Sequence, residues 1–213
     1  MGTVSVRGRG SVATRPDEAV VSVEISALKR SREDAYREVA ERSQKLDGLA
    51  DELGIDARRR TTSGVSVAEH FEWEKNRNVS KGFRASTRIV YRLEEPEVVA
   101  KLLEQAVVRA EARVDGPWWQ IKTDNPAHLE ARRLAATDAR RKAEAFAEAL
   151  GTKLGKIERV AEPGTEGPQV LMQPAPMRAM AASDAMAPAP VIELQPGELF
   201  VEAAVEISFA IEQ

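Results

Sequence analysis

The sequence predicts an α+β protein with an antiparallel or mixed sheet, three main helices on one face and the element order β-β-α-β-β-α-β-α-β-loop-β. Two observations carry this prediction. Apolar and polar residues alternate in segments at both ends of the 213-residue chain, and three internal segments carry apolar residues at helical spacing. This length suits one domain, or two closely packed lobes, rather than a string of modules, and we expect residues 1–213 to form a single domain.

The chain begins with two predicted strands. Val4 and Val6 alternate with polar residues, and Gly8-Arg9-Gly10 is expected to interrupt that first strand. After the turn at Pro16-Asp17, apolar residues recur at every second position from 19 to 27, which indicates a half-buried antiparallel strand.

The first helix is predicted over about 32–53. Ser31 is a suitable N-cap, and Gly54 is a suitable residue to end the helix in a left-handed conformation. The apolar stripe of this helix consists of Ala35, Val39, Leu46, Leu49 and Leu53.

Two strands near 60–73 and 82–94 follow, joined by a polar connection. Pro96 then occupies the position of a first-turn proline in a second helix, whose apolar stripe ends at Ala110. A short strand is expected near 114–122.

The longest helix is predicted over about 126–150, and strands near 154–161 and from 199 to the C-terminus complete the fold. The expected buried face of this helix consists of Ala135, Ala139, Ala143, Phe146 and Leu150. Between the last two strands, a segment rich in proline, alanine and methionine at about 163–192 predicts a long flexible loop. Four of the five methionines lie there, but no Cys or His accompanies them, so we expect no copper(I) site.

The composition excludes several function classes. The chain has no Cys, which rules out disulfides, iron–sulfur ligation, thiolate zinc sites and cysteine catalysis. His70 and His128 lack metal-ligand spacing, so surface or capping roles are expected and no metal or cofactor is predicted. The net charge of −3 gives no bulk attraction to nucleic acid, and the basic runs 58–60 and 140–142 suggest solvated surface.

No catalytic residue is predicted. Gly8-Arg9-Gly10 and the glycines of 151–156 lack the spacing of phosphate-binding loops, and there is no nucleophile elbow. Glu202 and Glu206 share a strand face at roughly 13 Å, which is wider than paired catalytic carboxylates need. We therefore expect a protein that is not an enzyme; a deep pocket with two close carboxylates, or with His128 beside a carboxylate, would favour one.

Two groups of residues form the candidate interaction surface. Trp118 and Trp119 are adjacent on a predicted strand and should point to opposite faces, one into the core and the other covered or exposed. Arg84, Arg88 and Arg92 share one face of their strand, as Glu198, Glu202 and Glu206 do on the last strand. These ladders predict a polar face with cross-strand ion pairs, and the alternative is that the arginines meet an acidic partner or subunit.

Several short motifs resemble the SIMPL-domain family of bacterial α+β proteins. They are Val4-x-Val6-x-Gly8-x-Gly10 with Pro16-Asp17, Leu53-Gly54-Ile55 with Thr61-Thr62-Ser63, residues 82–86, residues 138–151 with Leu154-Gly155, and Pro196-Gly197-Glu198. The most specific is 138–151, and together the motifs span almost all of residues 3–211. The turn after the second helix, Ala110-Glu111-Ala112, departs from the family's small-residue turn.

The resemblance implies the family's fold, self-association into a homo-oligomer and no agreed catalytic residue, together with a loose link to stress responses and envelope biology. We therefore expect a non-enzymatic protein that acts through self-assembly or binding of a protein partner. The alternative is a small-molecule binder with a pocket beneath the 163–192 loop. The chain shows no transmembrane segment and starts without an apolar leader, so we expect a cytoplasmic protein. The alternative location is periplasmic or secreted, after removal of a leader.

Overall fold

The computed structural model describes residues 2–74, 76–162 and 193–212, and it has the predicted α+β order of elements. The described residues fall into two compact units. The terminal unit holds β1 (Gly2–Thr14), α3 (Ala127–Ala149), β6 (Lys153–Ala161) and β7 (Leu199–Glu212). The inserted unit holds β2 (Glu18–Lys29), α1 (Arg32–Glu52), the 3₁₀ turn η1 (Ala57–Arg59), β3 (Arg60–Glu74), β4 (Arg77–Leu93), α2 (Pro96–Ala110) and β5 (Arg113–Gln120). The predicted loop at 163–192 lies outside the described residues.

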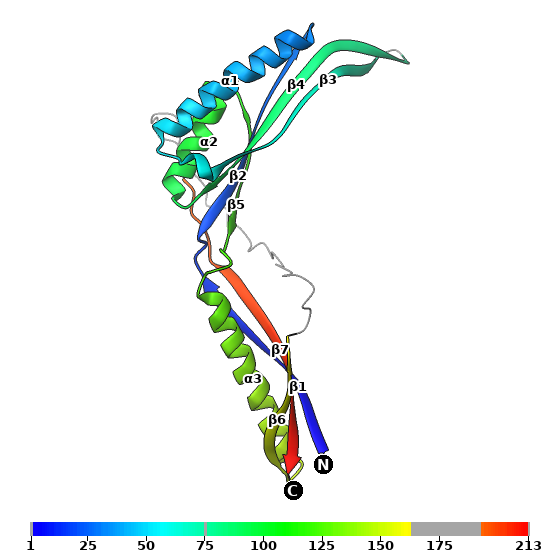
Figure 1. Ribbon diagram of the computed structural model, residues 1–213, viewed down its shortest axis with the longest axis vertical. Helices are drawn as coiled ribbons and strands as arrows, with labels where there is room; N and C mark the ends of the chain where they lie inside the picture. The colour runs from blue at the N-terminus through cyan, green and yellow to red at the C-terminus, as the bar shows by residue number, and fades with distance from the viewer. Residues whose placement is uncertain (1, 75, 163–192, 213) are drawn as a thin grey trace, which may run out of the picture. The chain divides into compact units, whose positions relative to one another are not determined.

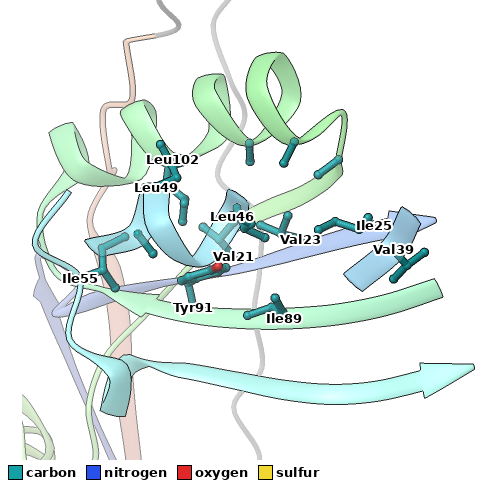
Figure 2. Packing of buried hydrophobic residues seen from close by; sticks show 14 of the residues in the cluster. Val21, Val23, Ile25, Val39, Leu46, Leu49, Ile55, Ile89, Tyr91 and Leu102 are labelled. Carbon is teal, nitrogen blue, oxygen red and sulfur yellow. The ribbon is translucent and has the colours of Figure 1, made fainter. Parts of the chain in front are cut away.

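The inserted unit is a four-stranded antiparallel sheet in the order β3-β4-β2-β5, with α1 and α2 on one face (Figure 1). The alternation in β2 and β4 directs every second side chain of each strand into the core. Figure 2 shows these side chains meeting those of the two helices. The fully buried members with the largest volume are Tyr91, Ile25, Leu46, Leu49, Leu102, Val21, Val23 and Val99.

Tyr91 brings a polar atom into this apolar core. Its side chain is fully buried, and its hydroxyl has no hydrogen-bond partner among the described residues. Burial raises the pKa of the Tyr91 hydroxyl, and the nearby Asp47 carboxylate raises it further. The residue therefore contributes through its ring, which packs among the aliphatic side chains of Figure 2.

The helix ends follow the sequence signals. The Ser31 side chain accepts a hydrogen bond from the Asp34 N–H, and Gly54 follows the C-cap of α1 with φ of 70°. Helix α2 begins at Pro96 and ends at Ala110, and its C-cap residue Glu111 adopts a left-handed conformation. The Arg42 guanidinium of α1 donates to the carbonyl oxygens of Ala110 and Glu111, so the end of α2 is satisfied by a side chain of the neighbouring helix.

The terminal unit is a three-stranded antiparallel sheet, β1-β7-β6, with α3 packed along it (Figure 1). The prediction that Gly8-Arg9-Gly10 interrupts the first strand is wrong, because β1 runs unbroken through it. A Cβ on Gly8 would lie 2.0 Å from the Ala135 carbonyl oxygen, and one on Gly10 would lie 2.1 Å from that of Ala131. The glycines thus allow the helix backbone to touch the strand.

The buried face of α3 is narrower than predicted. It consists of alanines at every fourth position: Ala127, Ala131, Ala135, Ala139, Ala143 and Ala147. Phe146 and Leu150 were expected on this face but are 56% and 66% exposed. Phe146 is one residue before Ala147, so it projects about 100° around the helix from the buried stripe.

Candidate protein-binding surface

The face of the inserted sheet opposite the helices carries most of the predicted interaction residues. Arg84, Arg88 and Arg92, here called the arginine ladder, alternate with the buried residues of β4 and are exposed. Trp118 pairs with Val20 of β2, and Val20 pairs with Arg92, so Trp118 and the ladder share this face.

The two tryptophans point to opposite faces, as predicted. Trp119 pairs with the buried Ala19 and packs against the core, whereas Trp118 is 44% exposed. The structure therefore brings four of the five predicted residues to one face and assigns Trp119 to the hydrophobic core. A role of these residues in binding remains a prediction.

The arginine ladder has partners of its own within the inserted unit. The guanidinium of Arg88 forms an ion pair of 2.7 Å with Glu24 on β2, and a guanidinium nitrogen of Arg84 lies 3.3 Å from Nε2 of His70 on β3. Glu198, Glu202 and Glu206, here called the glutamate ladder, do not form cross-strand pairs with the arginine ladder, because β4 and β7 belong to different sheets. Glu198 precedes β7, and Glu202 and Glu206 are exposed.

Strand β3, predicted near 60–73, forms one edge of the inserted sheet, and its residues were not among the predicted interaction residues. The strand is 15 residues long, and all of its residues are exposed except Arg60 and His70, which are half-buried. Four exposed apolar side chains project from one of its faces: Val65, Val67, Phe71 and Trp73. We call them the β3 apolar row. Their odd-numbered spacing was visible in the sequence, but alternation alone indicates an apolar face without showing whether anything covers it.

The outer part of the β3–β4 hairpin has no third strand. The end of β2, Lys29, pairs with Phe83, so β3 and β4 pair only with each other from there to the turn. Phe71 and Trp73 lie in this two-stranded part and are 52% and 68% exposed. Figure 1 shows the tip of the hairpin extending past α1. Among the described residues of the inserted unit, no helix or further strand therefore covers the outer half of the apolar row.

The opposite face of the hairpin is charged. The Lys81 ammonium forms ion pairs with Glu74 and, at 3.8 Å, with Glu72, and Nε2 of His70 lies 3.6 Å from Glu72. The Glu74 carboxylate is the main cause that raises the pKa of Lys81. The hairpin is therefore amphipathic although it is exposed on both faces, a pattern typical of a binding surface.

Strand β1 is also an edge strand, but side chains of α3 cover its backbone. The Arg9 N–H donates to the Asp138 carboxylate at 3.0 Å, and the Lys142 ammonium donates to the Arg7 carbonyl oxygen at 2.9 Å. Lys142 also forms a 2.6 Å ion pair with Asp138. The hydrogen bond from Lys142, followed by that from the Arg9 N–H, lowers the pKa of Asp138 to about 2. The most family-specific stretch of the sequence thus closes a sheet edge.

Neither of the features that would favour an enzyme is found among the described residues. Two hollows of the inserted unit are lined by carboxylates, and both are shallow and open to solvent. One, of about 80 Å³, is lined by Ser22, Glu24, Arg88, Arg113 and Asp115. The other, of about 460 Å³, is more open still and is lined by Lys29, Arg30, Asp34, Arg37, Glu38 and Glu41. Nε2 of His128 lies 3.0 Å from the carbonyl oxygen of Lys122, which is a local backbone contact. No group of three or more metal-ligating side chains occurs in residues 2–74, 76–162 and 193–212. The methionines at 172, 177, 180 and 186 and the pocket expected beneath the loop lie outside these ranges.

The basic runs are largely neutralised by carboxylates, as expected for solvated surface. Arg59 pairs with Glu94, Arg140 with Glu144, and Arg141 with Asp138. Arg60 also forms an ion pair, with Asp51, but unlike the others its side chain is only 14% exposed and donates to the Ile55 carbonyl oxygen as well. It packs at the end of the α1–β3 connection.

One antiparallel sheet covered by two helices and another covered by one define an α+β protein. Its exposed apolar residues include those of the edge strand β3. The SIMPL family model, described as "Protein of unknown function (DUF541)", matches residues 4–209 and so spans both units. The chain therefore belongs to the SIMPL family, as the sequence motifs indicated.

Two relatives carry names that call them periplasmic. The chain is 25% identical over 166 residues to the 26 kDa periplasmic immunogenic protein of Brucella melitensis, and equally to that of Brucella abortus. The match covers 75% of this chain and 66% of each relative. These names agree with the periplasmic alternative better than with the cytoplasmic expectation. None of the described helices is long and apolar enough to span a bilayer.

Solved structures add little. A hydantoinase/carbamoylase family amidase from Burkholderia ambifaria matches 50% of this chain and 29% of its own at 14% identity with a TM-score of 0.29. A second such amidase, from Burkholderia phymatum, matches 54% of this chain and 31% of its own at 11% identity with a TM-score of 0.26. Scores this low carry no argument about function.

Proposed function

We propose that this SIMPL protein is a non-enzymatic binding protein of the bacterial envelope that joins other chains through the open edge of β3. One observation carries the proposal: a long edge strand that is exposed along its length and bears four apolar side chains on one face. An open strand offers unpaired N–H and C=O groups to an added strand, and the apolar row offers specificity. The face of the arginine ladder and Trp118 adjoins this edge through β4.

The two named relatives support the envelope as the location, since both are called periplasmic. A role in stress response follows from the family resemblance and belongs to the same proposal. Binding by strand addition needs no catalytic group, so the proposal includes the prediction that the protein is not an enzyme. Cell fractionation tests the location: release of the chain with the periplasmic contents supports it, and retention in spheroplasts contradicts it.

Site-specific photo-crosslinking in bacterial cells tests the binding surface. A photoreactive phenylalanine derivative replaces Val67 in the apolar row, and the matched control carries it at Leu129 of α3, which is 72% exposed. We expect defined protein adducts from position 67 that are absent from position 129 and that disappear when Phe71→Ser is added. Absence of adducts from position 67 at native expression would overturn the proposed function.

A further inference from the structure

The apolar row of β3 is arranged symmetrically around one residue, so two antiparallel copies of the strand can align their apolar side chains. Between Gly64 and Glu74 the strand has no extra residue, because the irregularity at Ser63 lies before it and that near His70 is caused by Lys81 on β4. Glu69 is the middle residue of this regular stretch. Val67 and Phe71 flank it at two positions, and Val65 and Trp73 flank it at four. Apolar side chains therefore occur at the same spacing in both directions from Glu69, although their identities differ.

We propose that the occupant of the β3 edge is a second copy of this chain, paired antiparallel to β3 about a two-fold axis at Glu69. This proposal rests on the proposed function and names its partner. In this register Val65 faces the partner's Trp73, and Val67 faces the partner's Phe71, so every member of the row meets another apolar side chain. The strand edges of both copies gain backbone partners.

The neighbouring registers fit less well. A two-fold axis at Ala68 pairs Val65 with Phe71 but puts Val67 against Glu69. An axis at His70 pairs Val67 with Trp73 but puts Phe71 against Glu69. Because side chains alternate between faces, only axes at a residue keep the two apolar rows on one side of the joined sheet. Among these three, the axis at Glu69 alone pairs all four apolar residues.

The charged face is complementary in the same register. The half of β3 nearer its start carries small residues on this face, at Gly64, Ser66 and Ala68. Glu74 lies opposite the partner's Gly64, beyond which the partner's Arg88 stands on β4. Two strands that flank a third strand in a sheet are separated by roughly 10 Å. An extended arginine and an extended glutamate side chain together span this distance when no side chain lies between them. Arg88 of the arginine ladder, which pairs with Glu24 in its own chain, would then also lie within reach of a carboxylate of the second copy.

One residue opposes this pairing. The two Glu69 carboxylates face each other at the axis, and like charges directly opposite each other destabilise a strand pair. Within the chain, the Glu69 carboxylate accepts a hydrogen bond from the Ser80 hydroxyl at 2.6 Å. Glu69→Gln should therefore tighten self-association, by about three- to fivefold in the dimer association constant. Sedimentation equilibrium measures this change, and an unchanged or weaker association would count against the axis.

Single cysteines locate the axis directly, because the natural chain has none. Residues directly opposite each other have Cβ atoms about 4.5–5.5 Å apart, which is within reach of a disulfide with slight adjustment. Purified full-length Glu69→Cys should oxidise rapidly to a covalent homodimer, whereas Ala68→Cys and His70→Cys should not. A mixture of Ala68→Cys and His70→Cys should form the mixed dimer, since these positions face each other in this register.

The outcomes separate this proposal from the proposed function. Homodimers of Ala68→Cys or of His70→Cys alone would overturn the register. A wild-type chain that stays monomeric at several hundred micromolar, with no crosslink of Glu69→Cys, would overturn the second copy as occupant. If photo-adducts to another protein still formed at position 67 in cells, the proposed function would stand without this partner. If they did not, both would fall.

Discussion

The edge strands β1 and β3 both have backbone N–H and C=O groups along the outer side of a sheet. Side chains of α3 cover those of β1, whereas β3 is exposed. Strand β1 is covered, because its glycines let α3 touch the strand and because Asp138 and Lys142 occupy an N–H and a C=O of its outer edge. In the described part of the chain, no helix packs against the outer half of β3. Its apolar row holds large side chains where β1 has glycines. Natural proteins commonly block exposed strand edges, so the open edge of β3 supports a binding role for that strand.

The contrast also separates stability from binding. Substitutions at β1 should change the free energy of unfolding, because the strand is built into a contact between backbones. Substitutions in the β3 apolar row should change association instead, since these side chains are between 39% and 68% exposed. Each of the following experiments tests one side of this division.

Gly8→Ala should have the largest effect. The added methyl carbon would lie 2.0 Å from the Ala135 carbonyl oxygen and 2.8 Å from the Ala139 Cβ, so strand and helix must move apart. We expect a loss of about 3 kcal/mol or more in the free energy of unfolding, measured by urea denaturation. The matched control is Gly64→Ala on β3, where a Cβ would meet nothing within 4 Å, and it should change stability by less than about 0.5 kcal/mol. Equal losses in the two variants would contradict the contrast.

Asp138→Ala should come next. It leaves the Arg9 N–H without its acceptor and Lys142 without its carboxylate, so stability should fall by about 1–2 kcal/mol. It should also open β1 to other chains, which size-exclusion chromatography detects as new, larger species. In Asp138→Asn the amide oxygen still accepts from the Arg9 N–H, so this variant should lose less stability and stay closed. Identical behaviour of the two variants would argue against edge closure.

The pH dependence of stability should report on the same carboxylate. Folding lowers the pKa of Asp138 from 3.8 to about 2, because the ionised form is hydrogen-bonded and paired. Its contribution is therefore complete above about pH 4 and is lost as the pH falls through about 2. The stability difference between wild type and Asp138→Asn should shrink across this interval in urea titrations. A difference that stays constant from pH 5 to pH 2 would show that the Asp138 charge plays no part.

Phe71→Ser should have the smallest effect on stability and a clear effect on association. The side chain is 52% exposed in the two-stranded part of the hairpin, so the free energy of unfolding should change by less than about 0.5 kcal/mol. Self-association, measured by sedimentation velocity, should weaken by about tenfold, since a paired aromatic side chain is lost. Phe146→Ser on α3, at 56% exposure, is the control and should leave association unchanged. Equal weakening by both would indicate nonspecific adhesion.

The sequence alone determined the elements of this fold. Alternation placed β2 and β4, and Ser31, Gly54 and Pro96 marked helix ends to within a residue or two, because these signals depend on local backbone geometry. The opposite orientation of Trp118 and Trp119 followed from the same local rule. The family was also recognisable from the sequence, since its motifs keep their order along the chain.

Only the tertiary structure decided which surfaces are covered. Gly8 and Gly10 suggested a break in the first strand, but they allow the backbone of α3 to contact that strand. Phe146 was predicted to be buried, but the alanines of α3 form the contact with the sheet. The arginine and glutamate ladders looked like neighbours, yet they belong to different sheets. Above all, the alternation of β3 reads like that of β2, and nothing in the sequence says that β3 lies at an edge. Periodicity reports the conformation of a strand, whereas burial depends on which segments of the chain, distant in sequence, pack against it.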